Sequence, residues 1–276
     1  MTRSTATLIG FGAVLLWATL AAFATLSDGV PPLQLLATCF GIGGLLGLTR
    51  GLPRGVPAGA WALGVGGLTA YHLLYVLALR LAPPVEASLV AYLWPLLIVL
   101  ASALVQRLRW YHVAGALLGL AGAALVVTGG RLGFAPAPGH AVALFAAFVW
   151  TGYSVAQRRY ADVPTTAVTG FLLVAALLCG GASLAVETPV VPDTRQWIAI
   201  VGLGLGPVGA AFFLWDVGCK RGDLAVLGAS SYAAPLLSTM LLVALRLAEA
   251  TWTLALACVL ITGGAALAAS GMLRRG

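Results

Sequence analysis

Aromatic and hydrogen-bonding side chains stand in the middle of long apolar stretches of this sequence. Trp17, Trp94 and Trp150 fall near the centres of such stretches, and His72 is the only ionisable side chain close to the middle of one. Indole rings stack on flat solutes, and indole, imidazole and hydroxyl groups can form hydrogen bonds with them. No arrangement of Ser, His, Asp or Cys suggests nucleophilic catalysis. These residue types therefore indicate recognition of a small molecule rather than enzymatic chemistry.

Each buried polar group in this set allows two interpretations. The N–H of Trp17 or Trp150 needs a partner at mid-membrane depth, which is either a neighbouring helix or a wet cavity. His72 is either a neutral imidazole bonded to a carbonyl of a neighbouring helix, or a donor to a substrate carboxylate or a proton-linked switch. The expected substrate-binding residues are Trp17, His72, Tyr75, Tyr92, Trp94, Pro95, Trp150, Tyr153, Trp215, Ser231 and Tyr232.

Two prolines occupy equivalent places inside apolar stretches. Pro95 and Pro235 each remove one helical hydrogen bond, which frees the carbonyl groups of Ala91 and Ser231. A proline is an ordinary kink in a membrane helix, but paired helix breaks also indicate a site near the membrane midplane.

The elements that must position these residues are membrane helices. Hydrophobic residues make up 61 % of the chain and charged residues only 8 %, whereas soluble domains average about 25 % charged residues. Apolar runs of this length are typical of bilayer-spanning helices. Ten are expected: 8–26, 32–49, 60–80, 85–106, 112–129, 139–157, 165–186, 196–218, 224–246 and 251–272. The fold class predicted is an all-α membrane protein.

The basic residues segregate when ten spans are drawn. Eleven of the 15 Lys and Arg residues then fall on the side of both termini, which is therefore expected to be cytoplasmic. The eleven are Arg3, Arg50, Arg54, Arg107, Arg109, Arg158, Arg159, Lys220, Arg221, Arg274 and Arg275, and the other side has Arg80, Arg131, Arg195 and Arg246. The net charge of +7 thus reflects topology, and no nucleic-acid partner is predicted.

The two halves of the chain resemble each other. Residues 88–97 of the fourth span match 228–237 of the ninth, with a tyrosine and a proline at the same places. The same offset of 140 aligns Tyr75 with Trp215. We therefore expect two five-helix repeats, residues 1–134 and 135–276, in one integral-membrane transport domain.

The repeats must be inverted. Each contains five spans, an odd number, so the second copy enters the membrane from the opposite side. Arg80 and its counterpart Lys220 fall on opposite predicted sides, as inversion requires. Inverted repeats are the architecture of alternating-access carriers, in which one central site is presented to either face.

With these features, the chain resembles the ten-span branch of the drug/metabolite transporter superfamily. Glu249, followed by Gly263-Gly264, is similar to the usual signature of that repeat, whereas the first half has Gln106-Arg107 instead. His72-x2-Tyr75 and the segment 91–95 are most similar to bacterial aromatic amino-acid exporters. The resemblance implies an exporter of amino acids in the bacterial inner membrane, with a central pocket walled by spans 1, 3, 4, 6, 8 and 9.

Several other features narrow the function. No carboxylate is expected at mid-membrane depth, since Asp216 lies near a helix end and is expected to pair with Lys220. This favours a neutral or zwitterionic solute. No cofactor or metal site is predicted, because the four cysteines lack metal-binding spacing. Alternatives to amino-acid export are export of other metabolites or drugs, a lipid flippase and a membrane scaffold.

Packing features complete the expectations. Trp61, Trp110, Trp197 and Trp252 at span entrances are expected to anchor at the membrane interface. Gly115-x3-Gly119 and Gly263-Gly264 allow close helix approach, either within the protein or in a dimer. The protein is therefore expected to be a monomer or a homodimer embedded in the lipid bilayer.

Overall fold

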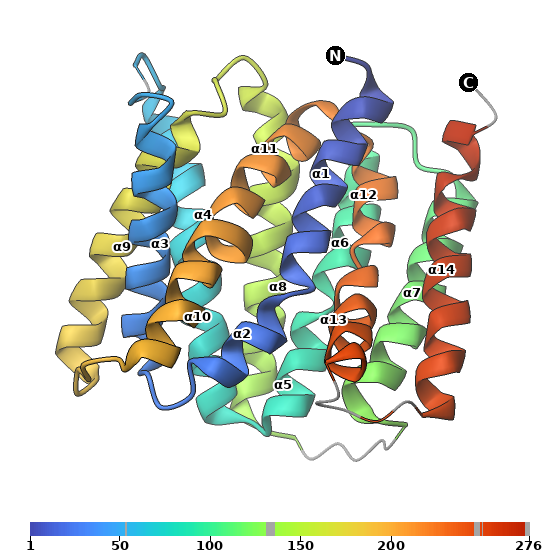
Figure 1. The fold of residues 1–276 in the computed structure, drawn as a ribbon. Helices are drawn as coiled ribbons and strands as arrows, with labels where there is room; N and C mark the ends of the chain where they lie inside the picture. The colour runs from blue at the N-terminus through green and yellow to red at the C-terminus, as the bar shows by residue number, and fades with distance from the viewer. Residues whose placement is uncertain (53, 131–135, 246–248, 250, 274–276) are drawn as a thin grey trace.

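The computed structural model is a bundle of helices that run between two ends of the molecule (Figure 1). It describes residues 1–273 except 53, 131–135, 246–248 and 250. Nine helical segments in this part of the chain are long and apolar enough to cross a membrane, and the tenth, α3 (Pro32–Leu48), is apolar and 17 residues long. The predicted all-α membrane fold with ten spans is confirmed.

The helices follow the predicted spans, but four spans are interrupted. The six spans without an internal interruption are α3, α4 (Ala58–Leu81), α7 (Trp110–Thr128), α8 (Pro138–Ala156, extended by η2, Gln157–Tyr160), α9 (Ala167–Val186) and α14 (Trp252–Leu273). The first span is α1 (Arg3–Trp17) and α2 (Leu20–Leu26), and the fourth is α5 (Pro84–Ala91), α6 (Trp94–Ala101) and η1 (Ser102–Leu104). The eighth span consists of α10 (Thr194–Leu205), the π-helix η3 (Gly206–Ala210) and α11 (Ala211–Arg221). The ninth span consists of α12 (Leu224–Ser230) and α13 (Ala233–Ala244).

The packing of the helices obeys the inverted repeat. The most extensive contacts join α3 with α9, α7 with α14, α4 with α8 and α1 with α11, which are spans 2 and 7, 5 and 10, 3 and 6, and 1 and 8. The repeat makes span 3 equivalent to span 8 and span 6 equivalent to span 1, so the contact between spans 3 and 6 is equivalent to that between spans 8 and 1. In the other two contacts, spans 2 and 7 and spans 5 and 10, each span packs against its own equivalent. Helix α1 begins and α14 ends at the same end of the bundle (Figure 1), as an even number of spans requires.

Parts of the prediction lie outside the described residues. These parts are the boundary between the repeats at 134 and 135, and the residues Arg131, Arg246, Arg274 and Arg275.

Proline explains three of the four interruptions. Pro95 and Pro235 follow the breaks between α5 and α6 and between α12 and α13, and Pro207 lies inside the π-helix. Because proline has no N–H, each break frees a carbonyl that the helix would otherwise satisfy. The first span breaks at Ala18–Thr19 without a proline; there the Thr19 hydroxyl donates to the Leu16 carbonyl at 2.7 Å. Such side-chain bonds compete with the helical pattern.

Glu187 fixes the helices at the end away from the termini. Its carboxylate accepts from the backbone N–H groups of Leu33 and Gln34 at the start of α3, at 3.0 to 3.1 Å. Arg80, at the end of α4, donates to the same carboxylate at 3.0 Å. A negative charge suits a helix N-terminus, and here it joins spans 2, 3 and 7.

The entrance tryptophans divide into two groups. Trp110 and Trp252 are 74 % and 83 % exposed, and Trp197 is also exposed, as the outward face of an interfacial anchor must be. Trp61 differs, because its ring packs edge-on against Phe171 at 5.2 Å between α4 and α9. Its position at a span entrance predicts an anchor, but Gly170 leaves the space that accepts the ring.

The glycines of the fifth and tenth spans serve internal packing. A methyl group at Gly115 would collide with the backbone carbonyl of Gly264, and one at Gly119 with the ring of Tyr232. At Gly263 a methyl group would meet nothing within 4 Å. Helices α7 and α14 therefore approach closely through Gly115, Gly119 and Gly264 (Figure 1).

This contact predicts opposite outcomes for two equivalent substitutions. Gly115→Ala should lower the melting temperature of the purified protein by several degrees, because overpacking costs about 1–3 kcal/mol. Gly263→Ala should leave the melting temperature unchanged or raise it, since alanine favours helix and the site is open. Equal melting temperatures for the two variants would contradict the packing of α7 on α14.

Candidate solute-binding pocket

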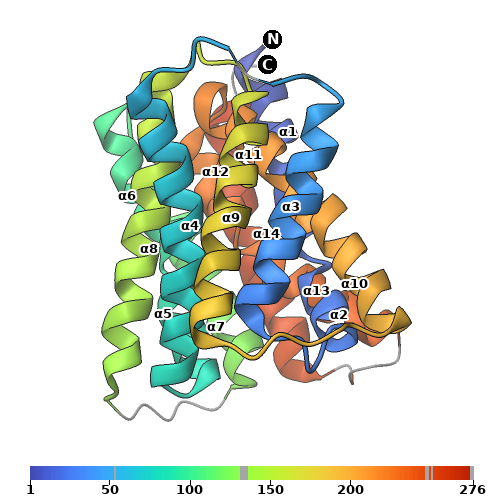
Figure 2. The same ribbon diagram turned by 90° about the vertical axis from the view of Figure 1, so that its left-hand side faces the viewer.

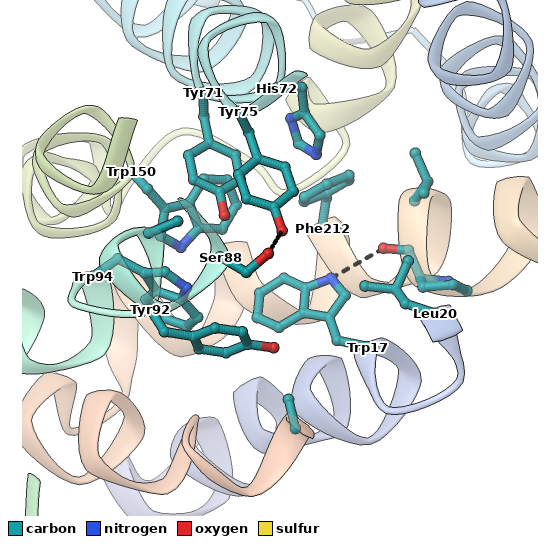
Figure 3. A pocket seen from close by; sticks show the side chains of 14 residues that line it. Trp17, Leu20, Tyr71, His72, Tyr75, Ser88, Tyr92, Trp94, Trp150 and Phe212 are labelled. Carbon is teal, nitrogen blue, oxygen red and sulfur yellow. Dashed lines mark hydrogen bonds between the residues drawn. The ribbon is translucent and has the colours of Figure 1, made fainter. Parts of the chain in front are cut away.

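A pocket lies where the interrupted spans face one another. It is lined by residues of α1, α2, α4, α5, α6, α8, η3, α11 and α13, which belong to spans 1, 3, 4, 6, 8 and 9. These are the six spans that the family resemblance implied. Its aromatic and polar lining residues are Trp17, Tyr71, His72, Tyr75, Ser88, Tyr92, Trp94, Trp150 and Phe212 (Figure 3).

Trp17 stands at the centre of an aromatic cluster. Its ring centroid lies 5.9 Å from that of Trp150, 6.1 Å from Trp94 and 5.0 Å from Trp215. Its indole N–H donates to the Pro207 carbonyl in the π-helix at 3.0 Å, as the dashed line in Figure 3 shows. This hydrogen bond connects the interruption of span 1 with that of span 8, and the two interruptions form one wall of the pocket.

Several polar groups in the pocket have no hydrogen-bond partner among the described residues. Tyr75 and Ser88 share a hydrogen bond of 3.0 Å between their hydroxyl groups. The hydroxyl of Tyr92 and the indole N–H groups of Trp94 and Trp150 form no hydrogen bond with any described residue. These groups are available to a bound solute.

His72 is bonded within its own helix. Its Nδ1 lies 2.7 Å from the carbonyl oxygen of Leu68, four residues earlier in α4. The bond expected in one interpretation, to a neighbouring helix, is therefore replaced by a local one. The ring meets Phe40, Tyr71 and Phe212 edge-on at centroid distances of 5.1 to 5.8 Å.

The structure places six of the eleven expected residues in the pocket lining: Trp17, His72, Tyr75, Tyr92, Trp94 and Trp150. The other five are buried and do not line the pocket: Pro95, Tyr153, Trp215, Ser231 and Tyr232.

Three of the five residues outside the lining make the following internal contacts. Trp215 donates to the Ser154 hydroxyl at 3.1 Å, and the Ser231 hydroxyl donates to the Leu227 carbonyl at 2.7 Å. Tyr153 packs its ring on Gly67 of α4.

Equivalent residues of the two repeats have different environments. Tyr92 lines the pocket, whereas Tyr232, its counterpart, is fully buried and accepts from the Leu96 backbone N–H at 3.1 Å. Tyr75 lines the pocket, whereas its counterpart Trp215 is fully buried. The structure is therefore asymmetric about the axis that relates the repeats.

The asymmetry coincides with a closed end. The lining residues of α4 lie in its second half, those of α5 in the first half of span 4, and that of α13 in the second half of span 9. These halves are the ones away from the termini. On the side of the termini, Asp223 accepts from Arg3 at 3.0 Å and from the Gln106 amide at 2.9 Å, and its backbone N–H donates to Thr7 at 2.8 Å. Arg158 donates to the neighbouring Gly222 carbonyl. These bonds connect spans 1, 4, 6 and 9.

A buried ion pair lies beside this closure. The Lys220 Nζ atom lies 2.8 Å from Asp216 Oδ1, and both side chains are almost fully buried. The predicted pairing is confirmed. Asp216 also accepts from the Thr165 hydroxyl at 2.7 Å, and Lys220 donates to the Val163 carbonyl at 2.9 Å. Span 8 is thereby attached to the connection between spans 6 and 7.

Residues that the sequence did not single out complete the pocket. Phe212 could have been found, because the offset of 140 aligns it with His72. Pro207 follows Gly206 inside an apolar span, which is a helix-breaking signal. Ser88 carries no such signal, and its role follows only from the bond to Tyr75.

The two equivalent tyrosines predict a difference in stability. Tyr232→Phe leaves the Leu96 N–H buried without its partner, which costs about 1–3 kcal/mol and should lower the melting temperature. Tyr92→Phe, the matched control, removes a hydroxyl that bonds to no described residue and should leave the melting temperature unchanged. A larger loss of stability for Tyr92→Phe would contradict this arrangement.

The comparisons with known proteins agree with this architecture. The model of the EamA-like transporter family matches the chain twice, at residues 4–128 and 137–270. The chain is 52 % identical to the aromatic amino acid exporter YddG of Ancylobacter novellus, over 97 % of this chain and 98 % of that protein. It is 28 % identical to the aromatic amino acid exporter YddG of Escherichia coli K12, over 97 % of each chain.

A solved structure has the same fold. It superposes with a TM-score of 0.92 at 51 % identity and covers 97 % of this chain and 98 % of the solved chain, which is described only as a crystal structure of a protein. With two family matches that together span nearly all of the sequence, the chain belongs to the EamA-like transporter family.

Proposed function

We propose that this protein is a secondary transporter that exports aromatic and other neutral amino acids across the bacterial inner membrane. The observation that carries the proposal is the aromatic pocket at the interruptions of spans 1, 4, 8 and 9. The names of its relatives, aromatic amino acid exporters, support the same substrate class.

The pocket suits a flat zwitterion. Its described lining residues include no Asp, Glu, Lys or Arg, so a solute with a net charge would have no counter-ion there. An amino acid carries its own opposite charges. Its aromatic ring would stack among Trp17, Trp94 and Trp150, with about 0.5–1.5 kcal/mol for each aromatic contact beyond burial.

Export proceeds by alternating access between two arrangements of the repeats. Both termini are cytoplasmic in this proposal, so the closed end faces the cytoplasm and the described state follows release of the solute. In the opposite state Tyr153, Trp215, Ser231 and Tyr232 approach the pocket, while Tyr75 and Tyr92 become buried. Pro95 and Pro235 provide the breaks at which the fourth and ninth spans bend.

Transport by reconstituted protein tests the substrate class. Vesicles preloaded with phenylalanine should accumulate labelled phenylalanine by counterflow, and other aromatic and neutral amino acids should compete. Trp17→Ala should reduce this exchange by about tenfold or more, because it removes several aromatic contacts and the bond to Pro207. Trp110→Ala, on an exposed ring, is the matched control and should exchange at the wild-type rate.

Competition also separates this proposal from its alternatives. If unrelated metabolites or drugs compete and amino acids do not, the protein is an exporter of another class. Movement of a labelled lipid between leaflets in place of amino acids would indicate a flippase.

Chemical labelling tests the closure, in a background without the four native cysteines. Gln106→Ala removes one bond to Asp223 and should speed maleimide labelling of Ser231→Cys from the side of the termini, by roughly 2- to 12-fold. Gln34→Ala, which removes two bonds to Val190 at the other end, should not change the labelling rate. Labelling that Gln34→Ala accelerates and Gln106→Ala does not would contradict the proposed closure.

A further inference from the structure

The hydrogen bond of His72 determines which nitrogen carries the proton. Nδ1 lies 2.7 Å from the Leu68 carbonyl oxygen, which can only accept. Nδ1 must therefore be the N–H donor, and in the neutral ring Nε2 is left as an acceptor with a free lone pair.

The free nitrogen faces the pocket. Nδ1 is turned back along α4, so Nε2 lies at the far end of the ring, and His72 is a lining residue (Figure 3). Nε2 has no hydrogen-bond partner among the described residues, and it is not enclosed by them either. The imidazole ring itself is surrounded by the rings of Phe40, Tyr71, Phe212 and Trp150, at centroid distances of 5.1 to 6.5 Å.

The opposite side of the pocket has the complementary chemistry. Trp94 and Tyr92 lie across the pocket from His72 in Figure 3, whereas Trp150 lies beside it, at a ring centroid distance of 6.5 Å. Their N–H and O–H groups can donate and have no partner among the described residues. An indole N–H can only donate. The pocket therefore combines one free acceptor nitrogen, on His72, with several free donor groups.

We propose that His72 is a specificity-determining residue that binds the ammonium group of the solute. The carboxylate of the same solute points to the donors of Trp94 and Tyr92 across the pocket. This orientation reverses the sequence-based expectation that His72 donates to a carboxylate. The pocket selects solutes with a free amino group over their deaminated or N-acylated analogues. The inference rests on the proposed function, amino-acid transport.

A panel of phenylalanine analogues tests the assignment. Reconstituted full-length protein exchanges labelled phenylalanine against unlabelled phenylalanine or 3-phenylpropionate, which lacks only the amino group. The wild type should prefer phenylalanine. His72→Phe, which keeps the aromatic volume without an acceptor, should reduce that preference by about tenfold. It should leave inhibition by 3-phenylpropionate nearly unchanged.

Two further variants separate recognition from packing. His72→Gln retains an acceptor oxygen and should keep much of the preference. Phe212→Leu changes the same wall without a polar atom and should affect both competitors alike. Wild-type preference in His72→Phe would overturn the proposal. The proposal would also be overturned if 3-phenylpropionate competed as well as phenylalanine in the wild-type protein, a result that can be obtained without any variant.

Failure of the proposed function gives a different result. If the wild type exchanges no amino acid at all, the proposal that it transports amino acids is wrong. Thermal stabilisation of the purified protein by phenylalanine and 3-phenylpropionate then measures the same preference without transport. Stabilisation by 3-phenylpropionate equal to that by phenylalanine overturns the role of His72, and stronger stabilisation by phenylalanine that His72→Phe abolishes supports it.

Discussion

In a bilayer every backbone polar group must find its partner within the protein, and interrupted helices are tolerated only where protein or water supplies one. This chain interrupts four of its spans and brings them together around one pocket. Trp17 satisfies the Pro207 carbonyl, and Tyr232 satisfies the Leu96 N–H. The same constraint that makes these breaks costly elsewhere thus concentrates hydrogen-bonding capacity at the site where a solute would bind.

The repeat explains why one sequence motif has two environments. Tyr92 and Tyr232 are equivalent along the chain, but one faces the pocket and the other supports the closed end. An arrangement with exact symmetry would be open to both sides or to neither. On the side of the termini, the polar bonds of Asp223 join spans 1, 4 and 9. Asp216 and Lys220 attach span 8 to the connection between spans 6 and 7 through Thr165 and Val163. In the proposed transport cycle, these are the bonds that must break before the opposite arrangement can form.

Much of this could be predicted from the sequence, for identifiable reasons. Apolar run length predicted the ten spans, proline predicted the breaks in spans 4 and 9, and spacing predicted the Asp216–Lys220 pair. The break at Ala18–Thr19 was missed because it depends on a local Thr19 bond and on the distant Pro207 carbonyl. Which member of each equivalent pair lines the pocket is a property of one conformational state, so residue type alone could not distinguish Tyr92 from Tyr232.

The central claim is that the closed end opens when solute moves. Spin labels at the exposed Arg107 and Arg221, at the ends of spans 4 and 8, would report the distance across that end in lipid nanodiscs. The account predicts a single short distance without solute and a second, longer distance when phenylalanine is added. One unchanged distance under both conditions, in protein that exchanges phenylalanine, would contradict it.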